Sequence, residues 1–342
     1  MNLIKTLTMI PFLFFSLNVS SQNPDFVKMV EYATKAPSGH NTQPWIFKLT
    51  DSTIEIHPDF SKALPVVDGH HRELYISLGC ALENLCIAAN EFGYDAKTSI
   101  EVDDNSHSYI IAKLEKSRLQ KNYLFDQIVK RQTNRSVYNN KLISSDTIKE
   151  LERISMEEHI DFQFFDKNTH NFNVLMNLVA EGNTQQLNDK AFKKELLEWI
   201  RFNKKQVEAT KDGLTYEVMG TPATPGFIGK PIVKSFLKPD KQNKTDMQKI
   251  NSSSHLVLFT VEHNNPENWI NLGRVLERIL LETTRLGIAN AYLNQPCEVE
   301  SVAESVQNQL QLGNKKPALL LRIGYANPLP YSPRKEVYEV IE

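Results

Sequence analysis

The stretch SLGCALENLCIAANEFGY, residues 77–94, occurs a second time in altered form near the end of the chain. The segment NLGRVLERILLETTRLGI, residues 271–288, aligns with it without a gap. The aligned pairs include Gly79 with Gly273, Glu83 with Glu277 and Gly93 with Gly287. Apolar positions in the second copy follow the 3.6-residue helical period, and each copy ends at a glycine suited to the C′ position. Both segments are therefore predicted to be core helices.

An apolar strand is expected after each of these helices. The segments are YIIAKLE from Tyr109 and ALLLRIG from Ala318. Chance similarity between two amphipathic helices is the alternative, but the paired glycines and the shared strands favour an internal duplication. We predict an α+β fold with two halves, residues 23–120 and 121–342, in which strands and helices alternate.

The composition limits the partners of the chain. With 342 residues and a net charge of −2, the chain has volume for a real core but no field that would steer it to nucleic acid. Its cysteines are Cys80, Cys86 and Cys297. On a helix, Cys80 and Cys86 would lie about 9 Å apart, which is too far for a disulfide. We expect buried thiols, no metal site and no nucleic-acid partner.

The first residues resemble a secretory signal peptide. Lys5 precedes an apolar run over 7–17, and small residues follow at 19–21. The run is too short to span a bilayer comfortably. We predict a signal peptide over 1–21, a periplasmic or secreted protein and no membrane association once the signal is removed. An apolar N-terminal helix that docks on a cytoplasmic protein is the alternative.

A polar loop is predicted at APSGHNTQPW, residues 36–45. Two prolines and a glycine rule out an uninterrupted helix, yet polar side chains and an indole are concentrated between them. Such a loop is suited to holding a ligand.

The segment KRQTNR places Arg131, Thr133 and Arg135 just before a predicted helix start at SSDTIKEL, with Ser145 or Thr147 as its cap. Two guanidiniums and a hydroxyl suit a phosphate monoester, and Arg334 in YSPRKE is a further candidate ligand. A solvated basic surface is the alternative.

Two other segments are candidates for a site. LNQPCE, residues 293–298, follows a strand-like AYL. Between the repeats the second half carries an extra stretch at about 192–240, which contains glycine, proline, Tyr216, Met219 and Phe227. Its aromatic content favours an ordered lid, with the part from Tyr216 to Phe227 as the candidate cover.

In combination and order, APSGHNTQPW, the paired helices, RQTNR and the closing RIGY and PRK motifs resemble the nitroreductase superfamily, and more narrowly its two-halved Acg-type branch. The resemblance covers nearly everything after about Asp25. It implies a nitroreductase-like fold in which the halves mimic a dimer and hold FMN between them.

The resemblance also implies roles for individual residues. Arg131, Thr133, Arg135 and Arg334 correspond to the phosphate ligands; Pro37, Ser38 and Gly39 to the loop that lines the flavin ring; and Leu293 and Asn294 to the segment beside flavin N5. Gly39 stands where ordinary members have a second serine, and Asn294 with Gln295 where they often have glutamate and glycine. Both departures alter the surroundings of the ring.

The activity implied is hydride transfer from NADH or NADPH to FMN and then to a nitroaromatic, a quinone or a similar acceptor. No general acid or base is assigned, because hydride transfer to a flavin does not require one from the protein. A flavin-sequestering protein with a lid and little turnover is one alternative, and a flavin-free structural relic is another. The sequence leaves open the acceptor, the choice of nicotinamide and any further oligomerisation.

One FMN per chain is expected. A second site would need a phosphate clamp in the first half and a proline-rich loop in the second. Residues 1–24 contain only Lys5 as a cation, and residues 146–166 contain no proline. A phosphate dianion without charged partners would lose hydration for little return.

Overall fold

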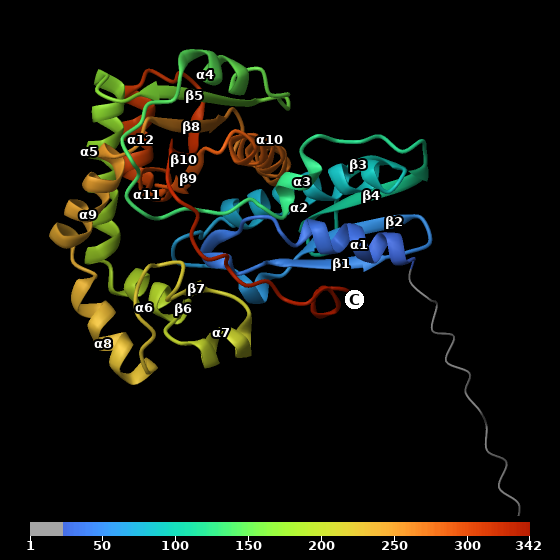
Figure 1. Ribbon diagram of the computed structural model, residues 1–342, viewed down its shortest axis with the longest axis horizontal. Helices are drawn as coiled ribbons and strands as arrows, with labels where there is room; N and C mark the ends of the chain where they lie inside the picture. Colours follow the sequence, from blue (N-terminus) through green and yellow to red (C-terminus); the bar gives the residue numbers. More distant parts are fainter. Residues whose placement is uncertain (1–22) are drawn as a thin grey trace, which may run out of the picture.

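The structure, a computed structural model, describes residues 23–342. The predicted signal peptide lies outside this part of the chain. None of the helices within residues 23–342 has the length and apolar character needed to cross a membrane. Figure 1 shows two sheets on opposite sides of a pair of long helices, α2 and α10.

The first half contains a four-stranded antiparallel sheet with the order β1-β2-β4-β3. Helix α1 begins at Pro24, where the Asn23 side chain caps it by accepting a hydrogen bond from the Asp25 backbone N–H. The elements are α1 (Pro24–Ala33), β1 (Trp45–Leu49), β2 (Thr53–Pro58), α2 (Arg72–Glu91), β3 (Tyr94–Val102) and β4 (Ser108–Lys116), with short 3₁₀ turns at Gly39–Asn41 and Phe60–Lys62.

The second half contains a four-stranded antiparallel sheet with the order β5-β8-β10-β9. Its core elements are α3 (Phe125–Ile128), α4 (Ser145–Leu151), β5 (Ile160–Asp166), α5 (His170–Asn188), β8 (His255–Val261), α10 (Pro266–Arg285), β9 (Ala289–Tyr292), α11 (Gln295–Glu298), α12 (Glu300–Gln309) and β10 (Lys316–Gly324). A last 3₁₀ turn spans Val337–Glu339. If the strands of each four-stranded sheet are numbered by their order along the chain, both sheets have the same spatial order: first, second, fourth, third.

The extra stretch at 192–240 is not a loop. It falls among α6 (Lys190–Glu198), β6 (Ile200–Arg201), α7 (Lys204–Thr210), β7 (Leu214–Thr215), α8 (Gly226–Phe236) and α9 (Pro239–Asn251). Strands β6 and β7 form a small parallel sheet. The stretch is ordered, as its aromatic content predicted, but helices rather than an extended cover account for most of it.

Helices α2 and α10 confirm the predicted core helices and cross at the aligned glycines. A Cβ atom added to Gly79 would lie 1.9 Å from the Ile270 carbonyl oxygen, and one added to Gly273 would lie 2.1 Å from the Ile76 carbonyl oxygen. The Cys80 thiol donates a hydrogen bond to the Gly273 carbonyl at 3.2 Å. Backbones this close leave no room for any side chain at the crossing.

Both long helices end as the sequence predicts. Gly93 and Gly287 follow the C-caps Phe92 and Leu286 with φ of 75° and 68°, in the left-handed region that glycine adopts without strain. The capping prediction for α4 is wrong. Ser144, rather than Ser145 or Thr147, is the N-cap, because its side chain accepts a hydrogen bond from the Thr147 N–H.

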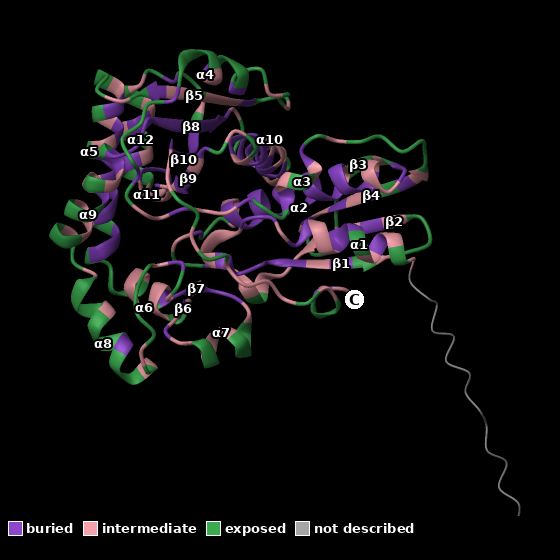
Figure 2. Cartoon of the chain, viewed as in Figure 1, coloured by how far each residue is buried: buried purple, intermediate pink, exposed green. Residues whose placement is uncertain are grey.

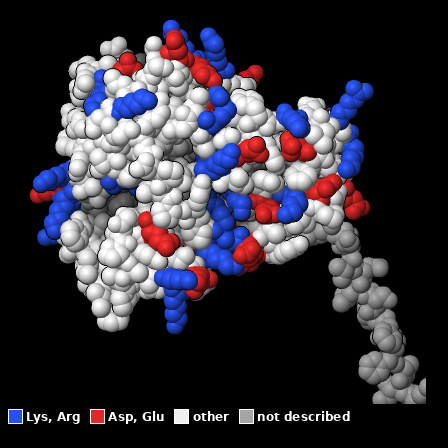
Figure 3. Space-filling view, in the orientation of Figure 1, with Lys and Arg blue, Asp and Glu red and all other residues white. Residues whose placement is uncertain are grey.

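One continuous hydrophobic core joins the halves. It includes apolar residues of α1, α2, β8, α10 and β10, and Figure 2 shows β8 and much of α2 and α10 buried. The C-terminal segment also crosses to the first half, where the Phe47 backbone N–H donates to the Val340 carbonyl at 2.8 Å. Cys80 and Cys297 are buried as predicted, whereas Cys86 is partly exposed. On the face shown in Figure 3, basic and acidic side chains are interspersed.

Substituting Gly79→Ala tests the helix crossing. The new Cβ would overlap backbone rather than a flexible side chain, so the helices must separate, and we expect a loss of at least about 3 kcal/mol in the free energy of unfolding. Urea unfolding followed by circular dichroism measures it. Gly69→Ala, whose Cβ would lie 3.4 Å from its nearest neighbour, is the matched control. Equal stability of the two variants would contradict the close crossing.

Candidate functional site

All of the cofactor-binding residues predicted from the sequence line one cavity of about 840 Å³. They are Pro37, Ser38, Gly39, Arg131, Thr133, Arg135, Leu293, Asn294 and Arg334. The cavity lies between the halves: one wall comes from the loop 36–45 and α2, and the other from segments of the second half. Their shared location is established by the fold, and their roles as ligands stay predictions.

The loop 36–45 has an unusual backbone. His40, Asn41 and Gln43 have φ of 48°, 57° and 55°, although only glycine adopts this region freely. The Ser38 hydroxyl oxygen accepts a hydrogen bond from the Gln43 backbone N–H at 3.0 Å. Such a cluster of left-handed residues costs free energy and persists only where surrounding contacts enforce it.

Asn41 and Gln43 provide those contacts. The Asn41 side chain accepts a hydrogen bond from Arg334 Nη1 at 2.7 Å and donates one to the Pro333 carbonyl at 3.2 Å. The Gln43 side chain donates to the Lys211 carbonyl at 2.8 Å and accepts from the Lys335 N–H at 2.9 Å. The two polar side chains therefore tie the loop to the C-terminal segment and to the inserted stretch.

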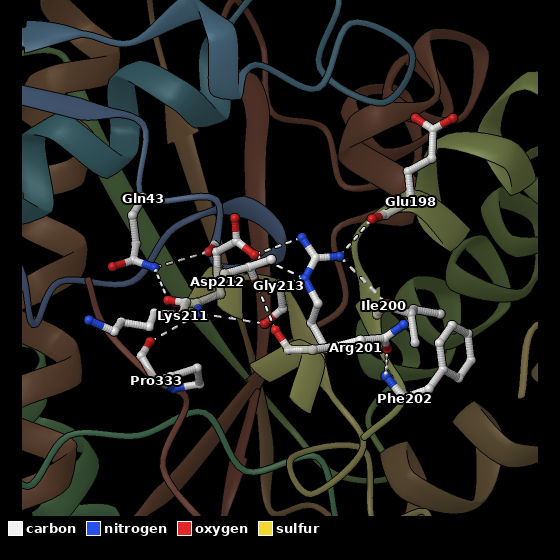
Figure 4. A network of polar contacts seen from close by, with 12 residues as sticks. Gln43, Glu198, Ile200, Arg201, Phe202, Lys211, Asp212, Gly213 and Pro333 are labelled. Atoms are coloured by element: carbon white, nitrogen blue, oxygen red, sulfur yellow. Dashed lines mark hydrogen bonds and ion pairs between the residues drawn. The ribbon is translucent and has the colours of Figure 1, made fainter. Parts of the chain in front are cut away.

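Hydrogen bonds within the extra stretch at about 192–240 hold it in place where it meets Gln43. Figure 4 shows Gln43 reaching Lys211 and the Arg201 guanidinium bound to Asp212. The Arg201–Asp212 ion pair measures 2.7 Å, and both side chains are largely buried. Sequence reasoning gave Asn41 and Gln43 no individual role, since nothing local shows which distant carbonyls they meet.

Arg131 and Arg334 converge on the end of α1. Arg131 Nη2 and Arg334 Nη2 both donate to the Lys35 carbonyl, at 2.8 and 3.1 Å. The only carboxylate that pairs with either of them among the described residues is Glu277, 3.5 Å from Arg131 Nε. Burial, reinforced by the nearby Arg131 charge, lowers the pKa of Arg334 to about 9. An anion at this end of the cavity would relieve the repulsion between the two guanidiniums.

The segment 131–135 is held beside β9. Thr133 forms an isolated bridge with Asn290, and the Asn134 N–H donates to the Asn290 carbonyl at 2.8 Å. This pairing fixes the arginines relative to the loop that follows β9. It explains how motifs that are far apart in sequence share one cavity wall.

Arg135 has no hydrogen bond or ion pair to any residue in the described part of the chain. Burial lowers the pKa of its guanidinium, and Arg322 lowers it further. Arg322 also lines the cavity, but it is engaged by the Asn134 and Ser136 carbonyls at 3.2 and 2.8 Å and lies over the Tyr138 ring. Sequence reasoning missed Arg322, although a charge within the apolar strand ALLLRIG was a usable signal.

Leu293 and Asn294 lie where β9 leads into α11. The Leu293 N–H donates to the Leu320 carbonyl at 2.8 Å, which continues the sheet pairing by one residue. Asn294 Oδ1 accepts from the Leu320 N–H at 3.2 Å, and Asn294 Nδ2 donates to Glu73 Oε1 at 3.0 Å. The contact with Glu73, a residue of α2 that the sequence analysis did not single out, places a carboxyl group at this end of the cavity.

Helices of the second half cover the cavity, but the segment from Tyr216 to Phe227, which we predicted as the cover, does not line it. From the extra stretch at 192–240, the apolar residues that line the cavity are Phe192 and Leu196 of α6, Leu214 of β7 and Leu237. Within residues 23–342, no residue between 215 and 236 is in the lining. Phe227, predicted as part of the lid, is 81% exposed on α8.

A search against protein-family models finds no match. The chain is 24% identical over 321 residues to two Mycobacterium tuberculosis proteins named provisionally as NAD(P)H nitroreductases, MT3217 and Rv3131. The alignment covers 91% of this chain and 89% of each relative. The resemblance to the nitroreductase superfamily is thereby confirmed, while the Acg-type branch stays a prediction.

Solved structures give more distant matches. An FMN-dependent nitroreductase from Mycobacterium smegmatis in complex with NADPH has a TM-score of 0.41 and 12% identity, with 62% of this chain and 94% of that chain covered. A nitroreductase with bound FMN from Bacteroides fragilis has a TM-score of 0.36 and 17% identity, with 60% and 90% covered.

His40 is expected to make the protein sensitive to acid. Burial, aided by the Arg135 charge, lowers the pKa of His40 to about 4, below its ordinary value. Between pH 6.5 and 4 the unfolded chain therefore binds more protons than the folded one, so stability falls as the pH falls. His40→Asn removes the titration and keeps a residue that tolerates positive φ.

We expect the wild type to lose about 1 kcal/mol or more relative to His40→Asn between pH 7 and pH 5, measured by urea unfolding at both pH values. His70→Asn, at an exposed position, is the control and should keep the wild-type slope. Parallel pH profiles for wild type and His40→Asn would show that His40 is not held neutral by the fold.

Proposed function

We propose that this relative of the nitroreductases is an FMN-dependent oxidoreductase that takes hydride from NADH or NADPH. One observation carries the proposal. A strained, proline-bounded loop from the first half meets Arg135 and Arg334 of the second half in one cavity, and neither arginine has a carboxylate partner within residues 23–342. The M. tuberculosis relatives, named provisionally as NAD(P)H nitroreductases, support the same activity.

The residues fit FMN. A cavity of about 840 Å³ is within the usual size of cofactor pockets. Arg135 has no partner within residues 23–342, and Arg334 makes hydrogen bonds there only to carbonyl oxygens and to the Asn41 amide. Buried cations without counterions are costly, and a phosphate group would neutralise them with charge-assisted hydrogen bonds.

In this proposal Arg131, Thr133, Arg135 and Arg334 hold the phosphate. Pro37, Ser38 and Gly39 line the ring, and Leu293 and Asn294 flank it on the side of N5. When bound, FMN supplies the hydride chemistry. The protein residues bind and orient it, and the apolar cover from α6 limits access of water. Nitroaromatics, quinones and similar small oxidants are the proposed acceptors.

We further propose that the halves arose by duplication and imitate a dimer, with boundaries near 23–120 and 121–342. The matching strand orders and the glycine crossing of α2 and α10 support this. Under the alignment of the two helices, Asn271, Arg274 and Leu82 correspond to Ser77, Cys80 and Leu276. Asn271, Arg274 and Leu82 line a second cavity of about 550 Å³. Their counterparts Ser77, Cys80 and Leu276 line the main cavity.

The second cavity is a poor phosphate site. Its only cation in the described part of the chain is Arg274. That guanidinium is already paired with Glu83 at 3.1 Å and Glu157 at 3.3 Å. An incoming phosphate would have to displace two carboxylates from a single arginine.

Export is part of the proposal, on the strength of the signal-like sequence over 1–21. A chain exported unfolded would bind FMN after translocation.

Double substitution of Arg131→Ala and Arg135→Ala tests the site. Loss of two charge-assisted contacts should weaken FMN binding at least about 100-fold, measured by fluorescence titration of the apoprotein. Arg153→Ala, on the exposed surface, is the matched control. Unchanged FMN affinity in the double variant would refute the phosphate assignment.

Turnover is tested on the wild-type holoprotein by stopped-flow mixing with NADH and with NADPH. Bleaching of the flavin absorbance within seconds is the expected result. The cover over the cavity keeps flavin sequestration as the alternative, and the absence of bleaching over minutes would favour it.

Flavin released by denaturation and measured against protein concentration is expected to be close to one FMN per chain. The reason is the difference in free cations between the two cavities. A ratio near two would show that the smaller cavity also binds flavin.

A further inference from the structure

A pair of carboxyl groups, the buried Glu73 and the half-buried Glu298, lines the main cavity away from the proposed phosphate ligands. Glu73 of α2 and Glu298 of α11 both line the cavity, and each is close enough to affect the pKa of the other. Glu298 Oε2 accepts a hydrogen bond from Gln186 Nε2 at 2.5 Å. Neighbouring carboxylates repel each other when both are charged, and burial adds to the cost of the second charge, so we expect the pair to share a proton.

Glu73 lies between the segments proposed to contact the ring. A Cβ atom on Gly39 would come within 3.4 Å of Glu73 Oε2, and Asn294 Nδ2 donates to Glu73 Oε1 at 3.0 Å. The carboxyl group therefore lies beside the position where a serine side chain would project if Gly39 were replaced. Gly39 and Asn294, which depart from the ordinary motif, therefore both lie next to this one side chain.

The charges around Glu73 keep it protonated. Burial raises its pKa well above the ordinary value, and the nearby carboxyls of Glu298 and Asp68 raise it further, against a smaller opposing effect of Arg72. The Arg72 guanidinium is directed to the Cys297 carbonyl at 2.8 Å, and Tyr292 and the Cys297 thiol are the remaining titratable neighbours. Glu73 is in the first turn of α2, but a helix N-terminus favours a carboxylate by only about 1 kcal/mol, less than burial costs it.

We propose that Glu73 is the proton donor to the electron acceptor reduced in this cavity. This inference rests on the proposed oxidoreductase function. Conversion of a quinone to a hydroquinone takes one hydride and one proton, and conversion of a nitro group to a nitroso group takes the same and releases water. The hydride, with both electrons, originates from NADH or NADPH. The O–H bond of Glu73 breaks, a new O–H bond forms on the acceptor, and Glu73 is left as a carboxylate.

Glu298 is placed to restore the proton. It neighbours Glu73 in the cavity lining and accepts a hydrogen bond from Gln186, which belongs to α5. Water at the cavity mouth protonates the Glu298 carboxylate, and transfer of that proton to Glu73 regenerates the donor and returns Glu298 to a carboxylate. Glu298 acts through Glu73 and is a positioning and relay residue.

The protonation state is tested without turnover. The infrared spectrum of the apoprotein at pH 7 should contain the C=O band of a protonated carboxyl group. Glu73→Gln, which keeps the size and the hydrogen-bond acceptor for Asn294, should remove that band. Glu267→Gln, at an exposed acidic position lining the smaller cavity, should retain it. Absence of the band in the wild type would overturn the proposal.

The donor role is tested on the two half-reactions of the holoprotein. Glu73→Gln should leave flavin bleaching by NADPH within about twofold of wild type and slow reoxidation by a quinone at least about 100-fold, the usual contribution of a general acid. Bleaching with an unchanged reoxidation rate would overturn the donor role alone. Failure of the wild type to bind FMN or to bleach would refute the proposed function, and the donor role with it.

The variant Glu298→Gln tests the donor role through the pH dependence of reoxidation, which would not change if Glu298 had only a structural role. Reoxidation should be constant at low pH and fall as the pH rises through the pKa of Glu73. Glu298→Gln removes a negative neighbour, so it should shift that fall to lower pH. This measurement also applies if Glu73→Gln does not fold. A pH profile unchanged from wild type in Glu298→Gln would contradict the coupling of the two carboxyls.

Discussion

The contact of α2 with α10 at Gly79 and Gly273 is the constraint on which the other features depend. With no side chain at the crossing, the helix backbones touch, and each helix can bury residues of both halves in one core. The crossing also fixes the wall of the main cavity, because Ile76, Ser77 and Cys80 lie on α2 next to it. A wider crossing would separate the loop 36–45 from the arginines of the other half.

The helices and sheets around this crossing are arranged nearly symmetrically, but the charged residues on its two sides are paired differently. The aligned residues Glu83 and Glu277 are both buried. Glu83, together with Glu157, pairs with Arg274 and Arg278, so the charges on that side of the crossing balance. Burial raises the pKa of Glu277 to about 7, and its only ion-pair partner in residues 23–342 is Arg131 of the main cavity. Arg135 and Arg334, on the side of the main cavity, have no carboxylate partner within residues 23–342, so that side retains free positive charge.

The main cavity combines two kinds of electrostatic cost. Arginines that lack carboxylate partners favour an anion, while the Glu73–Glu298 pair can avoid repulsion only by keeping a proton. Both costs are tolerated because the loop 36–45 is locked by Asn41 and Gln43 to segments far away in the chain. Unsatisfied charge, retained protons and backbone strain in one cavity are the marks of a site arranged for a ligand and a reaction.

Much of this arrangement was predictable from local pattern. The helical period and the terminal glycines of 77–94 and 271–288 predicted α2, α10 and their C-caps, and the quoted motifs contained every residue proposed to bind the cofactor. Helix periodicity and turn preferences depend on residues that are close together in the chain, so they can be predicted from the sequence.

The sequence did not predict that Glu73 lines the cavity, which groups Asn41 and Gln43 bind, or which residues cover the cavity. Each depends on contacts between residues that are distant in the chain, as between Thr34 and Arg334, whose hydrogen bond spans 300 positions. Burial and neighbouring charge set the protonation of Glu73, and both exist only after the chain has folded.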